Sequence, residues 1–306
     1  MKIVNIKSSD YTAQIDLSYG ANCVSLRNTK YRVNVLREAG EDTKIENPFL
    51  YGMPILFPVN RISGGEFTFN ERRYQFPINE PDTGCHIHGF LYETEFESVE
   101  SGENFIKCRY DSDDKYSFFP HSFRIEIDYS LSDQGLLQKT RVYNLSNTPM
   151  PCLLGFHTTF NIAFAQGSSK EDVCVLAQVG EEIERNMENY LPTGRILHNT
   201  DLSQRFNNGT FKPFGEKISK HYKSVGDGRI ELYNSALHIK AVYDVDEKFS
   251  WRLFYNGDAN EYICLEPQNV CVDALNAGLG GIYSQIESIP PKDCREYFTR
   301  ISVSEY

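Results

Sequence analysis

No long apolar run occurs in this sequence of 306 residues, and none approaches the ~18 consecutive apolar residues that a membrane-spanning helix requires. The first residues of the chain also lack the apolar core and small-residue cleavage site of a secretory signal. These two absences predict a cytoplasmic protein without a membrane partner.

Basic clusters are missing as well. The chain has 31 Lys and Arg against 42 Asp and Glu, and its formal net charge is −11. Because a nucleic-acid partner needs a basic stripe to meet its phosphates, we expect no nucleic-acid partner. The acidic balance itself indicates only solubility.

The eight cysteines are scattered and form no CxxC pair. Without a secretory signal they are interpreted as reduced, small apolar residues and not as a disulfide framework.

Helical periodicity is weak, whereas apolar and polar residues alternate in several segments, including residues 13–17, 123–129 and 237–242. Alternation predicts strands with one face inward. The clearest hairpin covers residues 65–76 and has a four-residue turn; Phe67 and Phe69 would face Tyr74 and Phe76.

Short strands separated by regular turns predict an all-β protein, a sandwich or barrel. A short helix is expected at residues 179–189, and a loop at 193–215. Because the strand pattern resumes afterwards and no linker is visible, residues 1–306 are predicted to form a single domain.

Four clusters of residues could take part in catalysis or binding, and two of them lie in the first third of the chain. Arg61 follows Asn60 at the end of a proline-bounded apolar run, where its planar fork of donors can meet hydroxyl oxygens or simply face water. His86 and His88, two apart in a strand, would share one face and suit a metal or a substrate. Alternatively, they are structural histidines.

The other two clusters contain an imidazole and a carboxylate. His157 lies among aromatic residues and has the chemistry of a general acid or base, although a core histidine would look the same. Glu266 ends an apolar strand just before a proline. Burial there would raise its pKa toward that of a useful base, with a structural ion pair as the alternative.

Taken together and in this order, the clusters resemble the aldose 1-epimerase (galactose mutarotase) family. The shared motifs are Asn60-Arg61-Ile62 through Phe67 and Tyr74 to Asn79-Glu80 and His88-Gly89, then Asn144 through His157 to Asn161, then Glu266-Pro267-Gln268 followed by Asn276-Ala277.

This resemblance implies a large antiparallel β-sandwich, the galactose mutarotase-like supersandwich, and a cofactor-independent isomerase. Glu266 would take the proton from O1 of a free hexose while His157 protonates the ring oxygen, so that the ring opens and recloses as the other anomer. The substrate-binding residues implied are Arg61, His88, Asn60 and Gln268. The protein would be a monomer or homodimer.

The sequence departs from the family pattern at several positions. Phe156 replaces an Asn before the histidine, Thr159 a Tyr, and Glu71 a Gly in the hairpin turn. A substrate-binding Asp of the family has no counterpart near residues 219–222. These departures leave the identity of the sugar open.

Three alternatives follow from the same residues. A hexose-phosphate epimerase would use the same acid–base pair. A non-catalytic sugar-binding or sensing domain would need the groove but not the pair. A cupin-like metalloenzyme would take its ligands from His86, His88, Glu93 and His157, although the second motif of that class is missing.

Overall fold

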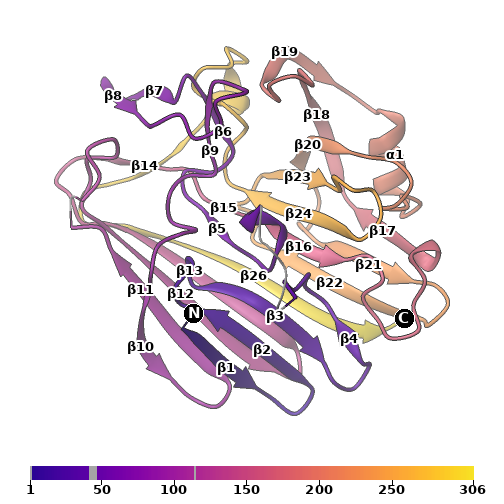
Figure 1. Ribbon diagram of the computed structural model, residues 1–306. Coiled ribbons are helices and arrows are strands. Elements are labelled where there is room, and N and C mark those ends of the chain that lie inside the picture. The colour runs from indigo at the N-terminus through magenta and orange to yellow at the C-terminus, as the bar shows by residue number, and fades with distance from the viewer. Residues whose placement is uncertain (1, 41–46, 114) are drawn as a thin grey trace.

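The computed structural model describes residues 2–40, 47–113 and 115–306. Antiparallel strands dominate it and assemble into two eight-stranded sheets, a four-stranded sheet and three two-stranded ribbons (Figure 1). The predicted all-β class and antiparallel sandwich are therefore confirmed.

The first eight-stranded sheet, called the back sheet below, has the order β10-β11-β12-β13-β26-β22-β21-β17. Its strands are β10 (Glu97–Ser101), β11 (Phe105–Asp111), β12 (Phe123–Ser132), β13 (Gly135–Asn144), β17 (Val173–Ala177), β21 (Ile230–Asn234), β22 (Ile239–Val245) and β26 (Cys294–Glu305). Buried residues alternate with partly exposed ones along most of β12, as its sequence pattern predicts.

The second eight-stranded sheet, called the site sheet, follows the path β19-β18-β20-β23-β24-β15-β5, with β16 paired to β24. Its strands are β5 (Ile55–Leu56), β15 (Gly155–Phe156), β16 (Thr158–Asn161), β18 (Val179–Arg185), β19 (Pro192–Leu197), β20 (Ser219–Ser224), β23 (Trp251–Tyr255) and β24 (Tyr262–Gln268). All seven residues of β24 are buried.

The remaining strands form smaller sheets. The four-stranded sheet contains β1 (Ile3–Lys7), β2 (Tyr11–Asp16), β3 (Asn22–Asn28) and β4 (Val33–Asn34). The ribbons pair β6 (Arg61–Ser63) with β9 (Cys85–Ile87), β7 (Glu66–Phe69) with β8 (Arg72–Gln75), and β14 (Met150–Cys152) with β25 (Glu287–Ile289). The helical elements are α1 (Asp201–Asn207), η1 (Pro48–Leu50), η2 (Lys170–Asp172) and η3 (Gly281–Ser284).

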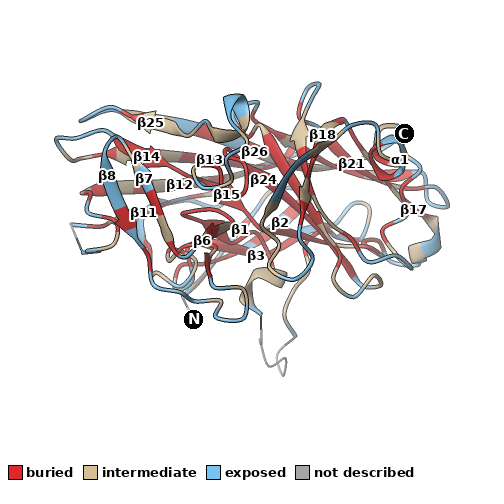
Figure 2. Ribbon diagram, turned by 90° about the horizontal axis from the view of Figure 1, so that it is seen from above, coloured by how far each residue is buried: buried red, intermediate tan, exposed pale blue. Residues whose placement is uncertain are grey.

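Buried apolar side chains from all three larger sheets form one contiguous cluster. In Figure 2 the buried residues follow the strands through the middle of the molecule, and the loops at its rim are exposed. Polar bonds join the layers inside this cluster: the Tyr129 hydroxyl donates to the carbonyl of Ala21 at 2.9 Å, and Thr158 Oγ1 lies 2.9 Å from the Tyr243 hydroxyl. No described helix is long and apolar enough to cross a membrane.

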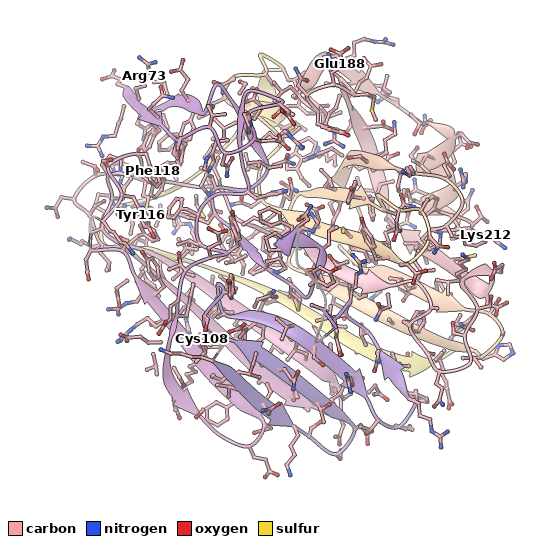
Figure 3. The ribbon with its side chains drawn as sticks, in the orientation of Figure 1. Arg73, Cys108, Tyr116, Phe118, Glu188 and Lys212 are labelled. Carbon is pink, nitrogen blue, oxygen red and sulfur yellow. The ribbon has the colours of Figure 1, made fainter. Side chains whose placement is uncertain are left out.

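An aromatic cluster supports the segment that follows β9. Tyr116 and Phe118, labelled in Figure 3, pack against Phe90 with ring centroids 4.2 Å and 5.2 Å away. Next to Phe90, Gly89 has a φ of 73°, and a Cβ there would lie 2.0 Å from the carbonyl oxygen of Phe57. Only glycine permits this backbone contact, which fixes the position of His88 one residue earlier.

Several sequence-based predictions need correction. The predicted helix at 179–189 is wrong: residues 179–185 form strand β18, in which Ile183 pairs with His221 of β20 and Arg185 with Pro192 of β19. The predicted loop at 193–215 contains most of β19 and the helix α1.

The hairpin at 65–76 is confirmed, but its turn is shorter than predicted. Asn70 and Glu71 alone connect the strands, both with positive φ, and the register places Phe67 opposite Tyr74 with the rings stacked at 4.8 Å. Phe69 lies opposite Arg72 and not opposite an aromatic residue. Both turn residues have left-handed backbone angles, which glycine adopts most easily. This explains why the family pattern has glycine at the position of Glu71.

Candidate active site

A cleft of about 410 Å³ lies where the β6–β9 ribbon meets strands β18, β20, β23 and β24 of the site sheet. Its lining includes Phe49, Asn60, Arg61, Glu80, His88, His157, Arg185, Tyr190, Ser219 and Glu266. The cleft therefore contains five of the six residues that the sequence singles out, and the sixth, Gln268, lies directly behind it.

Glu266 projects from the fully buried strand β24, and its side chain is 1% exposed. Burial raises the pKa of its carboxyl group to about 8, although the nearby guanidinium of Arg185 and a hydrogen bond from Gln268 act in the opposite direction. Desolvation dominates because no described residue donates a hydrogen bond to Oε1.

His157 lies between β15 and β16, where its backbone N–H donates to the carbonyl of Pro54 at 3.0 Å. Its Nε2 is 3.2 Å from Glu266 Oε1, and its Nδ1 has no hydrogen-bond partner among the described residues. Burial lowers the pKa of the imidazole to about 3. The structure thus brings the two predicted catalytic groups into direct contact.

These shifts determine how many protons the pair holds. Between a pKa of about 3 for His157 and about 8 for Glu266, the two groups together carry one exchangeable proton. That proton lies on the carboxyl group when the cleft is dry, and substrate hydroxyls that solvate the charges can move it to the imidazole. One group can therefore donate while the other accepts, which is the requirement of paired acid–base catalysis.

Asn60 and Gln268 hold Glu266 from behind. Asn60 Nδ2 donates to Gln268 Oε1 at 2.9 Å, and Gln268 Nε2 donates to Glu266 Oε2 at 3.2 Å. Asn60 has a φ of 61°, and its Oδ1 accepts the backbone N–H of Arg61 at 2.8 Å, a local bond that suits asparagine in this conformation. Both amides were predicted to bind substrate; in the structure their described bonds serve to orient the carboxyl group and the β6 backbone.

Arg61 is paired with an acid that the sequence did not single out as a site residue. Its Nε and Nη2 each donate to a different oxygen of Glu80 at 2.6 Å, and its guanidinium lies 4.6 Å from the centroid of the Tyr190 ring. This bidentate pair holds the pKa of the Glu80 carboxyl below its usual range, against desolvation. Arg61 is thereby fixed in the cleft wall as predicted, with its charge neutralised.

His86 and His88 do not share a face. His86 Nδ1 lies 2.8 Å from the carbonyl oxygen of Pro77, whereas His88, with a φ of 61°, leaves the strand and packs edge-on against His157 at 5.3 Å between ring centroids. Burial, more than the neighbouring His157, lowers the pKa of His88 well below its usual value. Phe49 packs against the rings of both His88 and His157, at 4.6 Å and 5.8 Å.

The possible metal ligands in the described part of the chain are His157, Cys264 and Glu266, whose donor atoms all lie within 4.8 Å of one another. His86 and Glu93 of the cupin alternative are not part of this group. Burial raises the pKa of both the Cys264 thiol and the Glu266 carboxyl, which favours their protonated forms. Metal ligands must be deprotonated, so this set of donors fits a metal poorly.

Arg185 is the principal residue that sequence reasoning missed. It ends β18, is 8% exposed, and its Nη2 donates to Ser219 Oγ at 2.9 Å. Ser219 begins the segment in which the family's Asp has no counterpart. The one available signal was the strand-like spacing of the buried Ile183 and Arg185 around the more exposed Glu184, which the expectation of a helix obscured.

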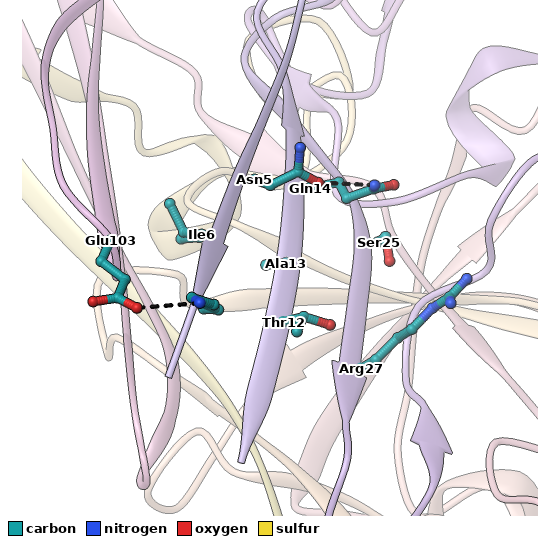
Figure 4. A pocket seen from close by; sticks show the side chains of 9 residues that line it. Asn5, Ile6, Thr12, Ala13, Gln14, Ser25, Arg27 and Glu103 are labelled. Atoms are coloured by element: carbon teal, nitrogen blue, oxygen red, sulfur yellow. Dashed lines mark hydrogen bonds and ion pairs between the residues drawn. The ribbon is translucent and has the colours of Figure 1, made fainter. Parts of the chain in front are cut away.

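A second hollow, of about 390 Å³, lies on the four-stranded sheet (Figure 4). Its polar side chains bond to one another: Gln14 Nε2 donates to Asn5 Oδ1 at 3.0 Å, and Lys7 forms an ion pair with Glu103 at 3.3 Å. Lys7 and Glu103 are 65% and 75% exposed. The acidic and basic residues of this lining, Lys7, Arg27 and Glu103, are all exposed, in contrast to Glu266 and His157 in the cleft.

Fold and site together define an all-β protein with a buried carboxyl–imidazole pair that lines a cleft of about 410 Å³. Residues 2–285 match the model of the aldose 1-epimerase family, and the chain belongs to that family.

Solved structures agree with this assignment. A galactose mutarotase-like protein from Clostridium acetobutylicum is 26% identical, with a TM-score of 0.91 over 99% of this chain and 95% of its own. A putative aldose 1-epimerase from Escherichia coli K12 is 17% identical, with a TM-score of 0.82 over 100% and 99%. A galactose 1-epimerase from Lactobacillus acidophilus NCFM is 15% identical, with a TM-score of 0.73 over 99% and 94%; at such identities the likeness shows the fold.

Proposed function

We propose that the protein is an aldose 1-epimerase that interconverts the α and β anomers of a hexose by acid–base ring opening and closure. The observation that carries this proposal is the contact between His157 Nε2 and Glu266 Oε1, 3.2 Å apart in a buried cleft. A protein that only binds sugar gains nothing from placing a buried carboxyl group against a buried imidazole, since burying each of them costs free energy.

In the proposed mechanism Glu266 accepts the proton of the anomeric hydroxyl while His157 donates a proton to the ring oxygen. The bond between the anomeric carbon and the ring oxygen breaks, and an open-chain aldehyde forms. After rotation about the C1–C2 bond, the hydroxyl attacks the other face of the aldehyde and both protons return. Each group therefore changes role once per turnover, and no net proton is consumed.

The residues around the pair have supporting roles in this proposal. Gln268 and Asn60 fix the rotamer of Glu266, and His88 binds hydroxyls near the ring oxygen through an imidazole that burial keeps neutral. Arg61, held by Glu80, offers its remaining N–H groups to a hydroxyl. About 10² to 10⁴-fold from each acid–base group is sufficient, because mutarotation is not intrinsically very slow.

Polarimetry of freshly dissolved α-D-glucose and α-D-galactose, together with phosphorylated and oxidised hexoses, tests the proposal. Wild-type protein is expected to accelerate mutarotation of at least one of these sugars, and boiled protein is the control. A protein that accelerates none of them would contradict the epimerase activity. Binding without acceleration would instead assign a sugar-binding protein.

A further inference from the structure

The cleft contains two guanidinium groups that are held in different ways. Arg61 donates two hydrogen bonds to Glu80. Arg185 donates one hydrogen bond, to the neutral Ser219, and its buried Nη1 has no partner among the described residues. The Tyr190 ring lies beside both, with its centroid 4.6 Å from Cζ of Arg61 and 5.9 Å from Cζ of Arg185.

The charges that line the cleft do not cancel. Arg61 and Glu80 neutralise each other. His88 and His157 are neutral at pH 7, because burial depresses the pKa of each. Glu266 is largely protonated, with a pKa of about 8. One positive charge, that of Arg185, is left over in a protein whose formal net charge is −11.

No other acid of the described chain takes the place of a partner for Arg185. Glu182, on the same strand, acts on Arg185 only through space, and its Oε1 accepts a hydrogen bond from Lys220 at 2.6 Å. Glu266 also attracts Arg185 electrostatically but remains protonated at neutral pH, so it does not neutralise the guanidinium. Burying a cation without a counter-ion costs free energy that a bound anion would offset.

We infer that Arg185 binds an anionic substituent of the aldose substrate, a carboxylate or a phosphate. This inference rests on the proposed function and specifies the substrate class of the same cleft. The unpartnered Nη1 and the adjacent Nη2 form the planar fork of donors that carboxylate and phosphate oxygens accept, and the hydroxyl of Ser219 accepts one hydrogen bond from Nη2. A neutral hexose would leave the charge of Arg185 unpaired.

The test compares an anionic sugar with a neutral sugar on each protein separately. Mutarotation rates are measured for glucose, glucuronate and glucose 6-phosphate on wild type, Arg185→Gln and Arg195→Gln. Arg195 is the matched control, since it lies on the neighbouring strand β19, is 71% exposed in its side chain and pairs with Glu184 outside the cleft. The readout is the ratio of kcat/KM for an anionic sugar to kcat/KM for glucose, because changes common to both sugars, such as an altered Glu266, cancel in this ratio.

The expected ratio is at least tenfold in wild type, falls about tenfold or more in Arg185→Gln, and is retained in Arg195→Gln. The preferred member of the two anionic sugars distinguishes carboxylate from phosphate. A wild-type ratio near one, or a ratio that Arg185→Gln does not change, would overturn the inference while the proposed function stands.

A failure of the proposed epimerase activity can be distinguished from a failure of the anion-binding inference. If no sugar is turned over, calorimetry measures the binding of glucuronate and glucose 6-phosphate to wild type and to Arg185→Gln. Binding that depends on Arg185 would support the anion site without the epimerase activity. Equal binding, or none, would overturn it.

Discussion

The cleft and the hollow on the four-stranded sheet are nearly equal in size, about 410 Å³ and 390 Å³, yet they differ in chemistry. In the hollow, Lys7 and Glu103 are exposed and paired. In the cleft, Glu266 and His157 are buried, and burial raises the pKa of Glu266 to about 8 and lowers that of His157 to about 3. Shifted ionisation, and not volume, therefore distinguishes the cleft from the hollow.

The largest expected effect comes from removing the acid in each region. Glu266→Gln is expected to lower kcat/KM by about 10³-fold or more, since an amide of the same shape cannot exchange the proton. Glu103→Gln in the hollow is expected to change it less than twofold. Initial rates of mutarotation give both values, and circular dichroism verifies the fold. Equal activity of the two variants would erase the distinction between the regions.

His157→Asn is expected to reduce kcat/KM by about 10² to 10³-fold, somewhat less than Glu266→Gln, because water can replace part of a proton donor. The matched control for His157→Asn is Thr12→Ala, which removes a hydroxyl from the lining of the hollow. If His157→Asn retains more than a tenth of wild-type activity, the imidazole has a structural role and the acid lies elsewhere.

The pH dependence of kcat/KM depends on the proton that Glu266 and His157 share in the cleft. Below a pKa of about 8 the pair holds one proton; above it Glu266 is ionised while His157 is already neutral, so no proton remains for the ring oxygen. We expect kcat/KM to fall about tenfold per pH unit above pH 8. Rates from pH 5 to 9.5, corrected for the spontaneous reaction, measure this limb. A rate that keeps rising through pH 9 would contradict the shared proton.

Much of the fold could be predicted from the sequence because alternation is a local property. Strands β12 and β22 and the hairpin β7–β8 were visible in the spacing of their apolar residues. Strand β18 was not, since its glutamates resemble a helix N-terminus and only pairing with β19 and β20 decides the outcome.

In the candidate site, too, some features could be predicted from the sequence and others could not. His157 and Glu266 could be found from residue type and order, but their 3.2 Å contact depends on the antiparallel register of β16 and β24, which no local pattern contains. Arg185 shows the opposite case. Its importance comes from burial without a carboxylate partner, which is a property of the assembled cleft and not of its neighbours in sequence.

The smallest effect expected is on stability, and its sign also separates the two regions. The folded-state pKa of Glu266 is about 8, above the ordinary value of 4.5, so the folded protein takes up a proton that the unfolded chain releases. The stability associated with this proton is fully present below pH 4.5 and is lost as pH rises toward 8.

Glu266→Gln removes this dependence. The variant is therefore expected to melt at nearly the wild-type temperature at pH 5 and several degrees above it at pH 8, with a difference that grows by on the order of 1 kcal/mol per pH unit. Glu103→Gln, whose carboxyl group is 75% exposed, should show no such trend. Thermal unfolding at both pH values measures the contrast. A wild-type protein more stable than Glu266→Gln at pH 8 would mean that Glu266 is ionised and paired in the folded state, which would remove the physical basis of the proposed shared proton.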